Sequence, residues 1–359
     1  MKRKTFFDSR DKYLSFVNST NEKSKIAFYL FKKIEKISTR SPIFNVLDAG
    51  TGEGTIISTF LSGLHKYLPN KPIFVVGKEI SIDDINVLLS FLGDRFAEHK
   101  TLIFNITNCS YKDLNNSTSD NVKFEKLELV GKKGIDFTKI LMSLSPYIRK
   151  NWKLSFNKNG SIKPKSKIFL TIYRKDQKKK LKDFIPRNIS EIPKKYDFII
   201  ASQCFKLRSP LTQTVKNVIK PLLSLLNFKG KMFLIYSSGK DFTGSFLKYY
   251  YPRNGFYKNS EPKKLISQIK KNIEKDKFKI KIEKLKYTFN NLSINLKEFS
   301  LNNIFSVWNA INYVGQVSEI EQKKVSFTKK NINILQKRLS KLKNIYFEDN
   351  IVNFEKERL

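Results

Sequence analysis

The segment Val46-Leu47-Asp48-Ala49-Gly50-Thr51-Gly52-Glu53-Gly54 decides the fold of this chain. An apolar run over 43–47 leads into it, and a helical pattern over 55–67 follows it. This order indicates a strand, a glycine-rich loop and a helix. Glycine residues in such a loop permit positive φ angles and let backbone N–H groups approach a ligand at the N-terminus of the helix. The segment therefore predicts a ligand-binding turn at the end of a strand.

Further strands and helices alternate along the chain at the intervals of βαβ units. Strand patterns occur over 71–80, 101–106, 196–201, 231–237, 278–289 and 345–354, and helical patterns over 12–37, 82–96, 213–226, 263–273, 304–314 and 329–342. Strands that alternate with helices in this way form a parallel sheet with helices on both faces. The sequence thus predicts an α/β protein with a doubly wound sheet.

The alternation is interrupted between residues 113 and 195, where polar, apolar and basic stretches follow one another. We therefore expect four parts: a helical N-terminal cap over 1–42, the first half of the core over 43–112, an inserted subdomain over 113–195, and the second half of the core with C-terminal antiparallel strands over 196–359. We also expect the insertion to be dispensable for ligand binding, because the flanking strands already supply the sheet edge where ligands bind.

The chain of 359 residues carries a formal charge of +37, from 69 Lys and Arg against 32 Asp and Glu. A charge of this size is an electrostatic footprint for nucleic acid or another polyanion. Only 11 of the 69 basic residues are arginine, which is the residue favoured for planar phosphate and base recognition. An excess of Lys, Asn, Ile and Phe is also what an AT-rich genome encodes, so coding bias and a nucleic-acid role both stay open.

Cysteine and histidine are scarce in this chain. Two cysteines, Cys109 and Cys204, cannot form a disulfide framework or a four-cysteine zinc site, and the only histidines are His65 and His99. We therefore expect no metal and a reducing compartment. Charged residues interrupt the segment Met1–Arg10, and no run of 18 apolar residues occurs. We accordingly expect no signal peptide, no membrane span and a cytoplasmic protein.

The spacing of the glycines separates this loop from the dinucleotide-binding fingerprint. Gly54 follows Gly52 by two residues, whereas the last glycine of G-x-G-x-x-G follows by three. Asp48 precedes the loop, where a carboxylate would repel a pyrophosphate and attract a positively charged ligand. The D-x-G-x-G-x-G pattern resembles that of the class I S-adenosylmethionine-dependent methyltransferases, with an ordinary structural turn as the alternative. The resemblance implies a Rossmann-like methyltransferase that binds S-adenosylmethionine through Asp48, Gly50, Thr51, Gly52 and Gly54.

Other segments match further cofactor contacts of that class. Glu79 ends the second strand, 25 positions after Gly54, where family members hold the ribose hydroxyls with a carboxylate. The loop after the third strand matches the position that holds adenine. The resemblance therefore adds, as cofactor-binding residues, Glu79, Ser81, Asn108, Cys109 and Ser202. The structural alternatives are a solvated strand-end glutamate, a buried cysteine and a plain polar loop.

The end of the fourth strand lacks two motifs of other methyltransferases. The segment Ser202-Gln203-Cys204-Phe205 is neither Asn-Pro-Pro-Tyr nor Asp-Pro-Pro-Tyr, which argues against methylation of glutamine or of exocyclic amines in nucleic acids. No proline precedes Cys204, and no second cysteine is well placed. A thiolate nucleophile that attacks cytosine is therefore not expected.

Ordered segments of the chain resemble the histamine N-methyltransferase-like group of small-molecule methyltransferases. The matching segments are Phe16–Glu22, Tyr67–Pro69, Glu79–Ser81, Lys195–Ile199 with Gln203, Lys231–Ile235 with Ser237–Gly239, and Phe347–Asn350. They cover most of the chain outside 113–195, whereas the long basic insertion departs from the family pattern. The resemblance implies N-methylation of a small amine or an imidazole-type metabolite.

In that group an N-terminal glutamate, a glutamine after strand four and a C-terminal asparagine contact the amine, which implies substrate-binding roles for Glu22, Gln203 and Asn350. We expect Glu22 and Gln203 to be catalytic: Glu22 or water takes a proton from the amine, and Gln203 orients its lone pair. Glu22 is displaced by one residue from the family pattern, so Asn21 is an equal candidate. Asp349 competes with Asn350. A surface helix residue, a helix cap and a turn residue are the structural alternatives.

Two other functions stay open. The basic segment 163–182, with Trp152, Phe169 and Tyr173 nearby, could contact RNA and make the protein a tRNA or rRNA methyltransferase. A protein that kept the cofactor loop but lost turnover would act by interaction alone. We expect a small-molecule substrate rather than a nucleic acid.

Overall fold

The computed structural model of the chain describes residues 10–34, 41–115, 121–156, 162–252, 261–273, 277–290, 300–325, 328–342 and 345–357. Residues 1–9, on which the expected absence of a signal peptide depends, lie outside this set. Across the described helices, none combines the length and the apolar composition needed to cross a membrane.

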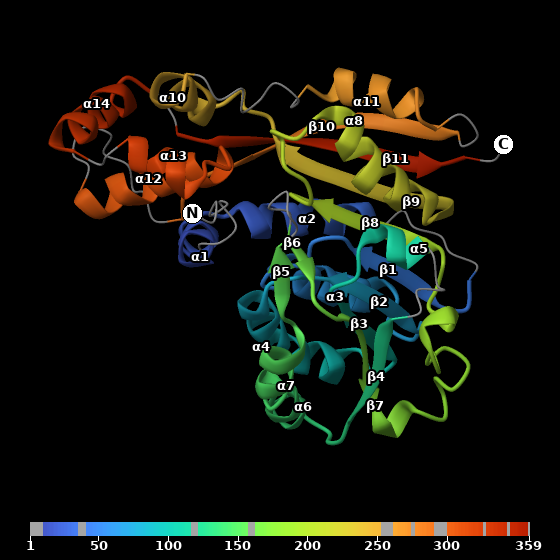
Figure 1. Cartoon of the computed structure of the whole chain (residues 1–359). Helices are drawn as coiled ribbons and strands as arrows, with labels where there is room; N and C mark the ends of the chain where they lie inside the picture. Colours follow the sequence, from blue (N-terminus) through green and yellow to red (C-terminus); the bar gives the residue numbers. More distant parts are fainter. Residues whose placement is uncertain are drawn as a thin grey trace.

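Figure 1 shows the helices and strands in chain order. The strands are β1 (Phe44–Asp48), β2 (Ile73–Lys78), β3 (Leu102–Thr107), β4 (Val122–Leu129), β5 (Leu154–Phe156), β6 (Ile162–Pro164), β7 (Lys167–Arg174), β8 (Tyr196–Ser202), β9 (Leu226–Ser237), β10 (Phe278–Tyr287) and β11 (Phe347–Lys356). The helices are α1 (Arg10–Ser19), α2 (Glu22–Ile34), α3 (Thr55–Tyr67), α4 (Ile82–Glu98), α5 (Tyr111–Asn115), α6 (Gly134–Met142), α7 (Ser145–Asn151), α8 (Leu211–Thr214), α9 (Lys220–Ser224), α10 (Phe242–Tyr250), α11 (Pro262–Lys270), α12 (Leu301–Val314), α13 (Glu319–Lys324) and α14 (Lys329–Leu339). A π-helical turn over Val215–Ile219 joins α8 to α9.

A nine-stranded sheet in the order β10-β11-β9-β8-β1-β2-β3-β7-β4 forms the centre of the described structure. The five strands β9, β8, β1, β2 and β3 are parallel, with Val46 of β1 opposite Val75 of β2 and Phe198 of β8. β11 runs antiparallel between β9 and β10, as predicted for the C-terminal strands. The strand order reverses at β1, and doubly wound folds bind ligands at the carboxyl ends of the strands beside such a reversal.

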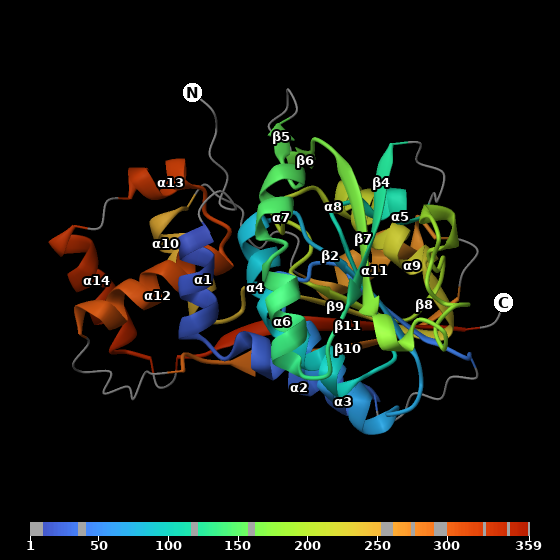
Figure 2. The ribbon, with the colours of Figure 1, turned by 90° about the horizontal axis from the view of Figure 1, so that it is seen from below.

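Helices cover both faces of the sheet (Figures 1 and 2). Apolar residues of α2, α3, α4, α6 and α7 share one core with one face, and those of α5, α9 and α11 share a second core with the other. Successive strand residues therefore face different cores: Val46 and Val75 the first, Leu47 and Val76 the second. Strands that are buried on both faces need continuous apolar sequences, which explains the short apolar runs of the sequence. The predicted Rossmann-like, doubly wound α/β fold is confirmed.

A helical lobe packs against one end of the sheet (Figure 2). Helices α1, α10, α12 and α14 share a third core with β11, which includes Phe16, Phe246, Ile311 and Phe347. Phe16 stacks on Tyr313 with ring centroids 4.2 Å apart. The predicted helical N-terminal cap is thus divided, because α1 belongs to this lobe whereas α2 packs on the sheet beside α3.

The segment 113–195 extends the central sheet rather than forming a separate body. β7 runs antiparallel to β3 and parallel to the edge strand β4, with Ile172 opposite Phe104 and Leu127. The short strands β5 and β6 form a sheet of their own. Trp152 is fully buried in the first core. Removal of this segment would strip β3 of a strand partner and the first core of a large aromatic residue, while its dispensability for ligand binding stays a prediction.

Candidate functional site

The glycine loop between β1 and α3 adopts a conformation that requires glycine at two positions. Gly52 has a φ of +56° and Gly54 a φ of +95°, and both lie in the left-handed region. A Cβ atom on Gly54 would lie 2.5 Å from Cδ1 of Leu88 on α4, and one on Gly52 would lie 2.6 Å from the hydroxyl of Tyr13 on α1. The loop is therefore held close to α3, α4 and α1 at the carboxyl end of β1.

Glu79 directly follows β2 and reaches this loop, because parallel neighbouring strands end at the same edge of the sheet. Its Oε2 accepts a hydrogen bond from Gly52 N at 2.9 Å, and its Oε1 accepts from Ile80 N and Ser81 N at 2.8 Å each. The indole Nε1 of Trp152 donates to the backbone oxygen of Glu79 at 2.9 Å. The carboxylate is thus fixed against the loop from one side and its own backbone from the other.

Asp48 places a buried carboxyl group at the start of the loop. Its side chain is 1% exposed, its Oδ1 lies 3.5 Å from Gly50 N, and its Oδ2 has no hydrogen-bond partner within the described part of the chain. Burial raises the pKa of Asp48 to about 7, while the Gly50 N–H group opposes that rise and the charge of Glu79 adds to it. An unpartnered acceptor in a buried site stabilises a ligand that brings a hydrogen-bond donor or a positive charge.

The side chains predicted to bind adenine, those of Asn108 and Cys109 after β3, contact other parts of the protein. Asn108 Nδ2 donates to Ser166 O at 2.9 Å, and Asn108 Oδ1 accepts from Ile168 N at 2.8 Å. Cys109 is buried in the second core, and burial raises the pKa of its thiol. Asn108 is thus bonded to Ser166 and to Ile168 at the start of β7, and Cys109 packs in the second core.

The two predicted serine contacts differ in their surroundings. Ser81 is the N-cap of α4, where its hydroxyl accepts from Asp84 N at 3.3 Å. Ser202 ends β8 with a buried hydroxyl that has no partner in the described residues. Ser202 therefore keeps a free polar atom at the sheet edge, whereas the side chain of Ser81 serves the helix.

A second cluster brings together residues that are far apart in the sequence. Gln203 Nε2 lies 3.3 Å from Glu22 Oε1 and 3.3 Å from Asp349 Oδ2. Glu22 begins α2, Gln203 follows β8 with a φ of +49°, and Asp349 lies in β11. Glu22 is 1% exposed and Asp349 is fully buried. The predicted pair of Glu22 and Gln203 is thus in direct contact.

The third member of this cluster is Asp349 and not Asn350. In β11, Asp349 is opposite Ser237 of β9 and Asn350 is opposite Tyr236. Successive residues of a strand point to opposite faces of the sheet. Asn350 therefore lies on the face away from Gln203, and the alternative left open by the sequence is the one that contacts it. Asn21, the rival of Glu22, instead accepts a hydrogen bond from Thr288 N at its Oδ1.

A cavity opens beside this cluster, between the sheet and the helical lobe. It is lined by Glu22, Gln203, Ser237, Tyr287, Tyr313, Val314 and Gln316. Three buried acceptors at or beside it, Glu22 Oε2, Asp349 Oδ1 and Ser237 Oγ, have no hydrogen-bond partner among the described residues. Lys23 Nζ lies 3.4 Å from Glu22 Oε2. The cavity is accordingly rich in acceptors, and Glu22, the acidic residue among those that line it, is paired with Lys23.

Tyr13 connects the glycine loop with the cavity. Its hydroxyl donates to Glu53 Oε2 at 2.6 Å, and its ring lies 5.6 Å from the ring of Tyr313, which lines the cavity. Burial raises the pKa of Tyr13 well above its ordinary value, so it stays a donor at neutral pH. Sequence reasoning missed Tyr13, because an aromatic residue in an amphipathic helix carries no signal beyond core packing. It likewise assigned no role to Ser237, although Ser237 stands in one of the quoted segments.

Cys204, next to Gln203, has no activated thiol. Burial raises its pKa to about 12, and the nearby Lys78 opposes the shift only in part. A thiol needs a lowered pKa to act as a nucleophile at neutral pH. This agrees with the expectation that no thiolate attacks the substrate. No group of three or more metal-ligating side chains is arranged to hold a metal ion in the described parts of the chain.

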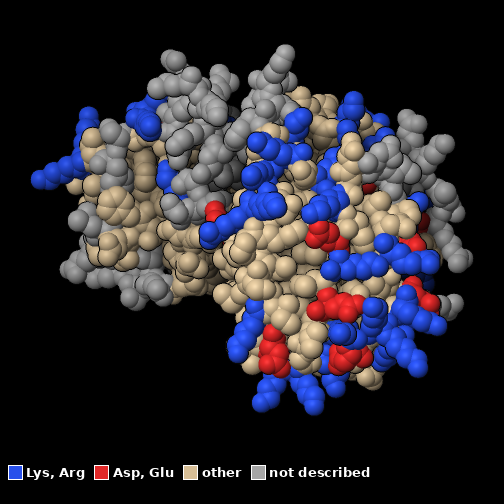
Figure 3. All heavy atoms as spheres, turned by 60° about the horizontal axis from the view of Figure 1, so that its bottom comes forward, with Lys and Arg blue, Asp and Glu red and all other residues tan. Residues whose placement is uncertain are grey.

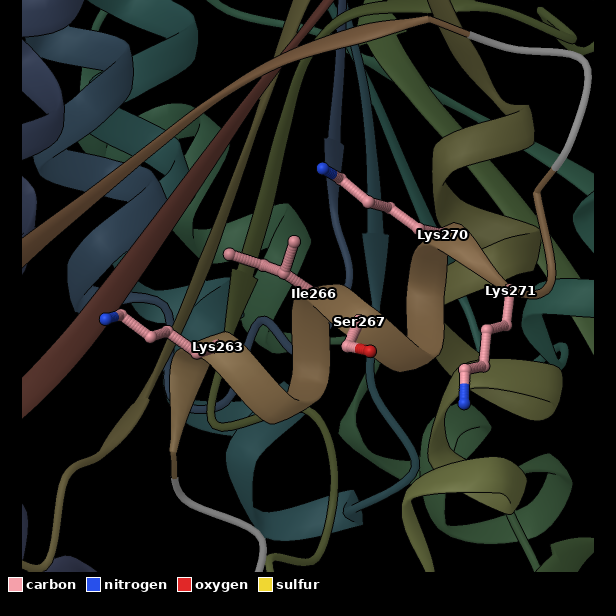
Figure 4. A pocket seen from close by; sticks show the side chains of 5 residues that line it. All are labelled: Lys263, Ile266, Ser267, Lys270 and Lys271. Carbon is pink, nitrogen blue, oxygen red and sulfur yellow. The ribbon is translucent and has the colours of Figure 1, made fainter.

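A separate surface hollow on α11 does not have the features of a site. It is lined by Lys263, Ile266, Ser267, Lys270 and Lys271, and Figure 4 shows these side chains spread along the helix, with Lys270 and Lys271 pointing apart. Four of these residues lie in α11 and the fifth, Lys271, directly follows it, and this helix packs on the second core. Its side chains do not converge on a ligand-sized position.

Lysine and arginine side chains are spread over the face shown in Figure 3, with acidic side chains between them. The ion pairs of the described residues include that between Lys178 Nζ and Glu128 Oε1, with a distance of 2.7 Å. The aromatic residues Trp152, Phe169 and Tyr173 are buried. Base stacking needs an exposed ring, so the hypothesis that these three residues help the basic segment to contact RNA is wrong.

No protein-family model and no curated protein matches the chain. It is similar to a solved structure from Listeria monocytogenes assigned to the class I S-adenosylmethionine-dependent methyltransferases, with 10% identity over 94% of this chain and 60% of that chain, at a TM-score of 0.36. It is also similar to Haemonchus contortus phosphoethanolamine N-methyltransferase 2 in complex with S-adenosyl-L-methionine, with 10% identity over 92% and 52% of the two chains, at a TM-score of 0.34. A third similar structure is MnmC2 from Aquifex aeolicus, with 13% identity over 92% and 74%, at a TM-score of 0.26. The chain thus spans 60% and 52% of the length of the first two structures, and the fold assignment rests on the strand order described above.

Proposed function

We propose that this protein is an S-adenosylmethionine-dependent methyltransferase that acts on a small amine. The observation that carries the proposal is the cavity lined by Glu22 and Ser237 with Asp349 beside it, where the buried acceptors Ser237 Oγ and Asp349 Oδ1 lack hydrogen-bond partners in the described structure. Buried acceptors are stable only when a donor or a cation satisfies them. An amine brings both. The cavity stands at the same end of the sheet as the glycine loop, to which Tyr13 connects it.

The residues of the glycine loop fit the cofactor. The unpartnered Oδ2 of Asp48 suits the ammonium of the methionine part, and Glu79 suits the ribose hydroxyls while it holds Gly52 N. Gly52 has a positive φ, which disfavours any side chain, and a Cβ atom there would also lie 2.6 Å from the Tyr13 hydroxyl. The bound cofactor would supply a methyl group on a sulfonium, which is its own leaving group. The hydroxyl of Ser202 and the backbone at Asn108 complete the proposed contacts.

The protein's part in the reaction is to hold the amine, take its proton and exclude water. An amine must have a free lone pair to accept a methyl group, so an ammonium must first lose a proton, and we propose that Glu22, which lines the cavity, receives it. Gln203 bridges Glu22 and Asp349 and so fixes where that acceptor lies. Tyr287 and Tyr313 close the cavity toward the helical lobe. Orientation of the two reactants is the largest expected contribution to the rate.

Calorimetry with S-adenosylmethionine and S-adenosylhomocysteine tests the cofactor part of the proposal. The wild-type protein should bind both with micromolar affinity, and Gly52→Val should bind neither, because a branched side chain cannot occupy this left-handed position beside Tyr13. The Ile282→Val variant, on the exposed part of β10, serves as a control that should bind normally. No heat with wild-type protein would reject the cofactor. Transfer of labelled methyl groups to amines in a metabolite extract tests turnover. If the protein binds the cofactor but transfers no methyl group, the result would support the alternative that it kept the cofactor loop and acts by interaction alone.

An RNA substrate is the rival proposal, and it rests on the net charge and on the basic segment 163–182. Binding of bulk tRNA should weaken steeply with salt if phosphate contacts dominate, whereas binding of a small amine should depend little on salt. Methyl transfer to RNA, and not to small amines, would replace the amine proposal. A cytoplasmic location stays a prediction of the sequence.

A further inference from the structure

The Glu22 and Asp349 carboxyl groups hold more potential negative charge than their surroundings neutralise. One amide nitrogen, Nε2 of Gln203, lies 3.3 Å from an oxygen of each. The second oxygen of each group has no hydrogen-bond partner in the described structure. A single neutral amide cannot compensate two buried carboxylates, since burial of an uncompensated charge is strongly unfavourable.

The charged groups around the pair leave this excess in place. They are Lys23 on α2, Asp241 before α10, and the ion pair of Glu348 in β11 with Lys284 in β10. Lys23 is the only cation of these that approaches the pair, and Asp241 adds a further acid. Burial above all, and then the charge of Glu22, raise the pKa of Asp349 well above its ordinary value. Two close carboxyl groups in a low dielectric keep a proton because they do not both ionise.

We propose that Asp349 keeps a proton while no cation occupies the cavity, and that a primary ammonium group entering the cavity displaces this proton to solvent. The ammonium brings one positive charge, Asp349 loses one proton, and charge and atoms balance. The inference rests on the proposed function only in taking an amine as the ligand. It deepens that function by assigning the site a ligand with several N–H donors and a fixed proton release on binding.

Ser237 supplies the independent observation that the cavity takes a donor-rich ligand. Its hydroxyl is buried, belongs to no carboxyl pair, lines the cavity and has no partner in the described structure. Together with Asp349 Oδ1 it makes two acceptors without a partner in the described structure, beside Glu22 Oε2, which Lys23 Nζ already approaches at 3.4 Å. A primary ammonium has N–H donors for both, whereas a quaternary ammonium has no N–H group and would leave both unsatisfied. The site should therefore distinguish methylammonium from tetramethylammonium.

A carbon-13 NMR titration of the aspartate carboxyl groups in the full chain tests the proposal. The signal that disappears in Asp349→Asn identifies Asp349, and Asp48→Asn identifies the other aspartate with a strongly raised pKa. Without added amine, Asp349 should titrate with a midpoint well above that of an ordinary aspartate, because burial and the charge of Glu22 raise its pKa. Methylammonium chloride should lower this midpoint by at least about one pH unit, which is a tenfold change in proton affinity. Potassium and tetramethylammonium chlorides at equal ionic strength should not.

Three results would overturn the proposal. A midpoint at the ordinary value of an aspartate without amine means that Asp349 keeps no proton in the empty cavity. Equal shifts with methylammonium and tetramethylammonium mean that the N–H donors play no part. An unchanged Asp349 midpoint in Glu22→Gln means that the pair does not share its charge, and this variant also serves if Asp349→Asn fails to fold. Cofactor binding is measured separately by calorimetry. A protein that binds no S-adenosylmethionine can still show the Asp349 shift with methylammonium, and a protein that binds the cofactor can lack that shift, so the two proposals can fail independently.

Discussion

Replacement of Glu79 tests the connection between the glycine loop and β2. Its carboxylate accepts hydrogen bonds from three backbone N–H groups, those of Gly52, Ile80 and Ser81. A hydrogen bond to a charged group contributes roughly 1.5–3 kcal/mol. These residues are all half-buried, so water replaces much of each bond in Glu79→Ala. We therefore expect the free energy of unfolding to fall by only about 1–2 kcal/mol, and the variant to stay folded.

Cofactor affinity should fall further than stability. Glu79→Ala removes the acceptor for the ribose hydroxyls and leaves Gly52 N without its fixed partner, a loss of about 1.5–3 kcal/mol in binding. This corresponds to a dissociation constant that rises about 10-fold to 100-fold. Glu79→Gln keeps one carbonyl oxygen as an acceptor and should give an intermediate value. Calorimetry with S-adenosylhomocysteine measures all three proteins without turnover.

Glu128→Ala is the matched control for this experiment. Like that of Glu79, its carboxylate accepts several hydrogen bonds, here from Tyr173 at 2.9 Å and from Lys178 at 2.7 Å. Glu128 lies on the edge strand β4, away from the glycine loop. Its cofactor affinity should equal that of the wild type. If folded Glu79→Ala also binds with the wild-type dissociation constant, the ribose does not lie at Glu79, and the assignment of this carboxylate is refuted.

Three further predictions concern stability and reactivity. Burial lowers the pKa of His99 from 6.5 to about 4, so between these values the unfolded chain binds a proton that the folded protein does not. The free energy of unfolding should therefore decrease by up to about 3 kcal/mol as the pH falls through this window, and urea unfolding of His99→Gln should lack that decrease; equal pH profiles would contradict the assignment. Gly52→Ala should cost about 1–2 kcal/mol for its left-handed backbone plus the contact with the Tyr13 hydroxyl. Combined with Tyr13→Phe it should cost less than the sum of the single changes in urea unfolding, whereas additive costs would show that the contact is unimportant. Cys109 and Cys204, whose pKa values burial raises, should resist a thiol reagent at neutral pH until the protein is denatured; fast reaction of the folded protein would be the contrary result.

Local patterns predicted the part of the molecule that local sequence determines. The boundaries of α3 and the positions of Gly52 and Gly54 follow from a strand, a turn and a helix that are adjacent in the chain. The approach of Glu79 to the loop follows from the rule that parallel strands end at the same edge of the sheet. Neither inference needs a contact between distant segments whose register is unknown.

The parts that sequence could not supply depend on register and on distant contacts. Asp349 and Asn350 are neighbours in one strand, and only the pairing of β11 with β9 determines which of them faces Gln203. The strand β4 mixes apolar and charged residues along its length, so its place beside β7 in the main sheet is not visible in the pattern. Trp152 reads as one more aromatic residue until the fold brings its indole to the backbone of Glu79.

The late position of β11 in the chain affects how the protein folds during its synthesis. The ribosome reaches Phe347 only after it has made all the residues that line the cavity, from Glu22 to Gln316. β11 then inserts between β9 and β10. Until that moment the nascent chain exposes two unpaired strand edges, which are templates for aggregation. The cluster of Glu22, Gln203 and Asp349 joins residues more than 300 positions apart. Contacts between such distant residues form slowly. A ribosome that stalls before β11 therefore releases a chain with a formed glycine loop and an unfinished amine site, which chaperones and proteases would recognise by its open edges.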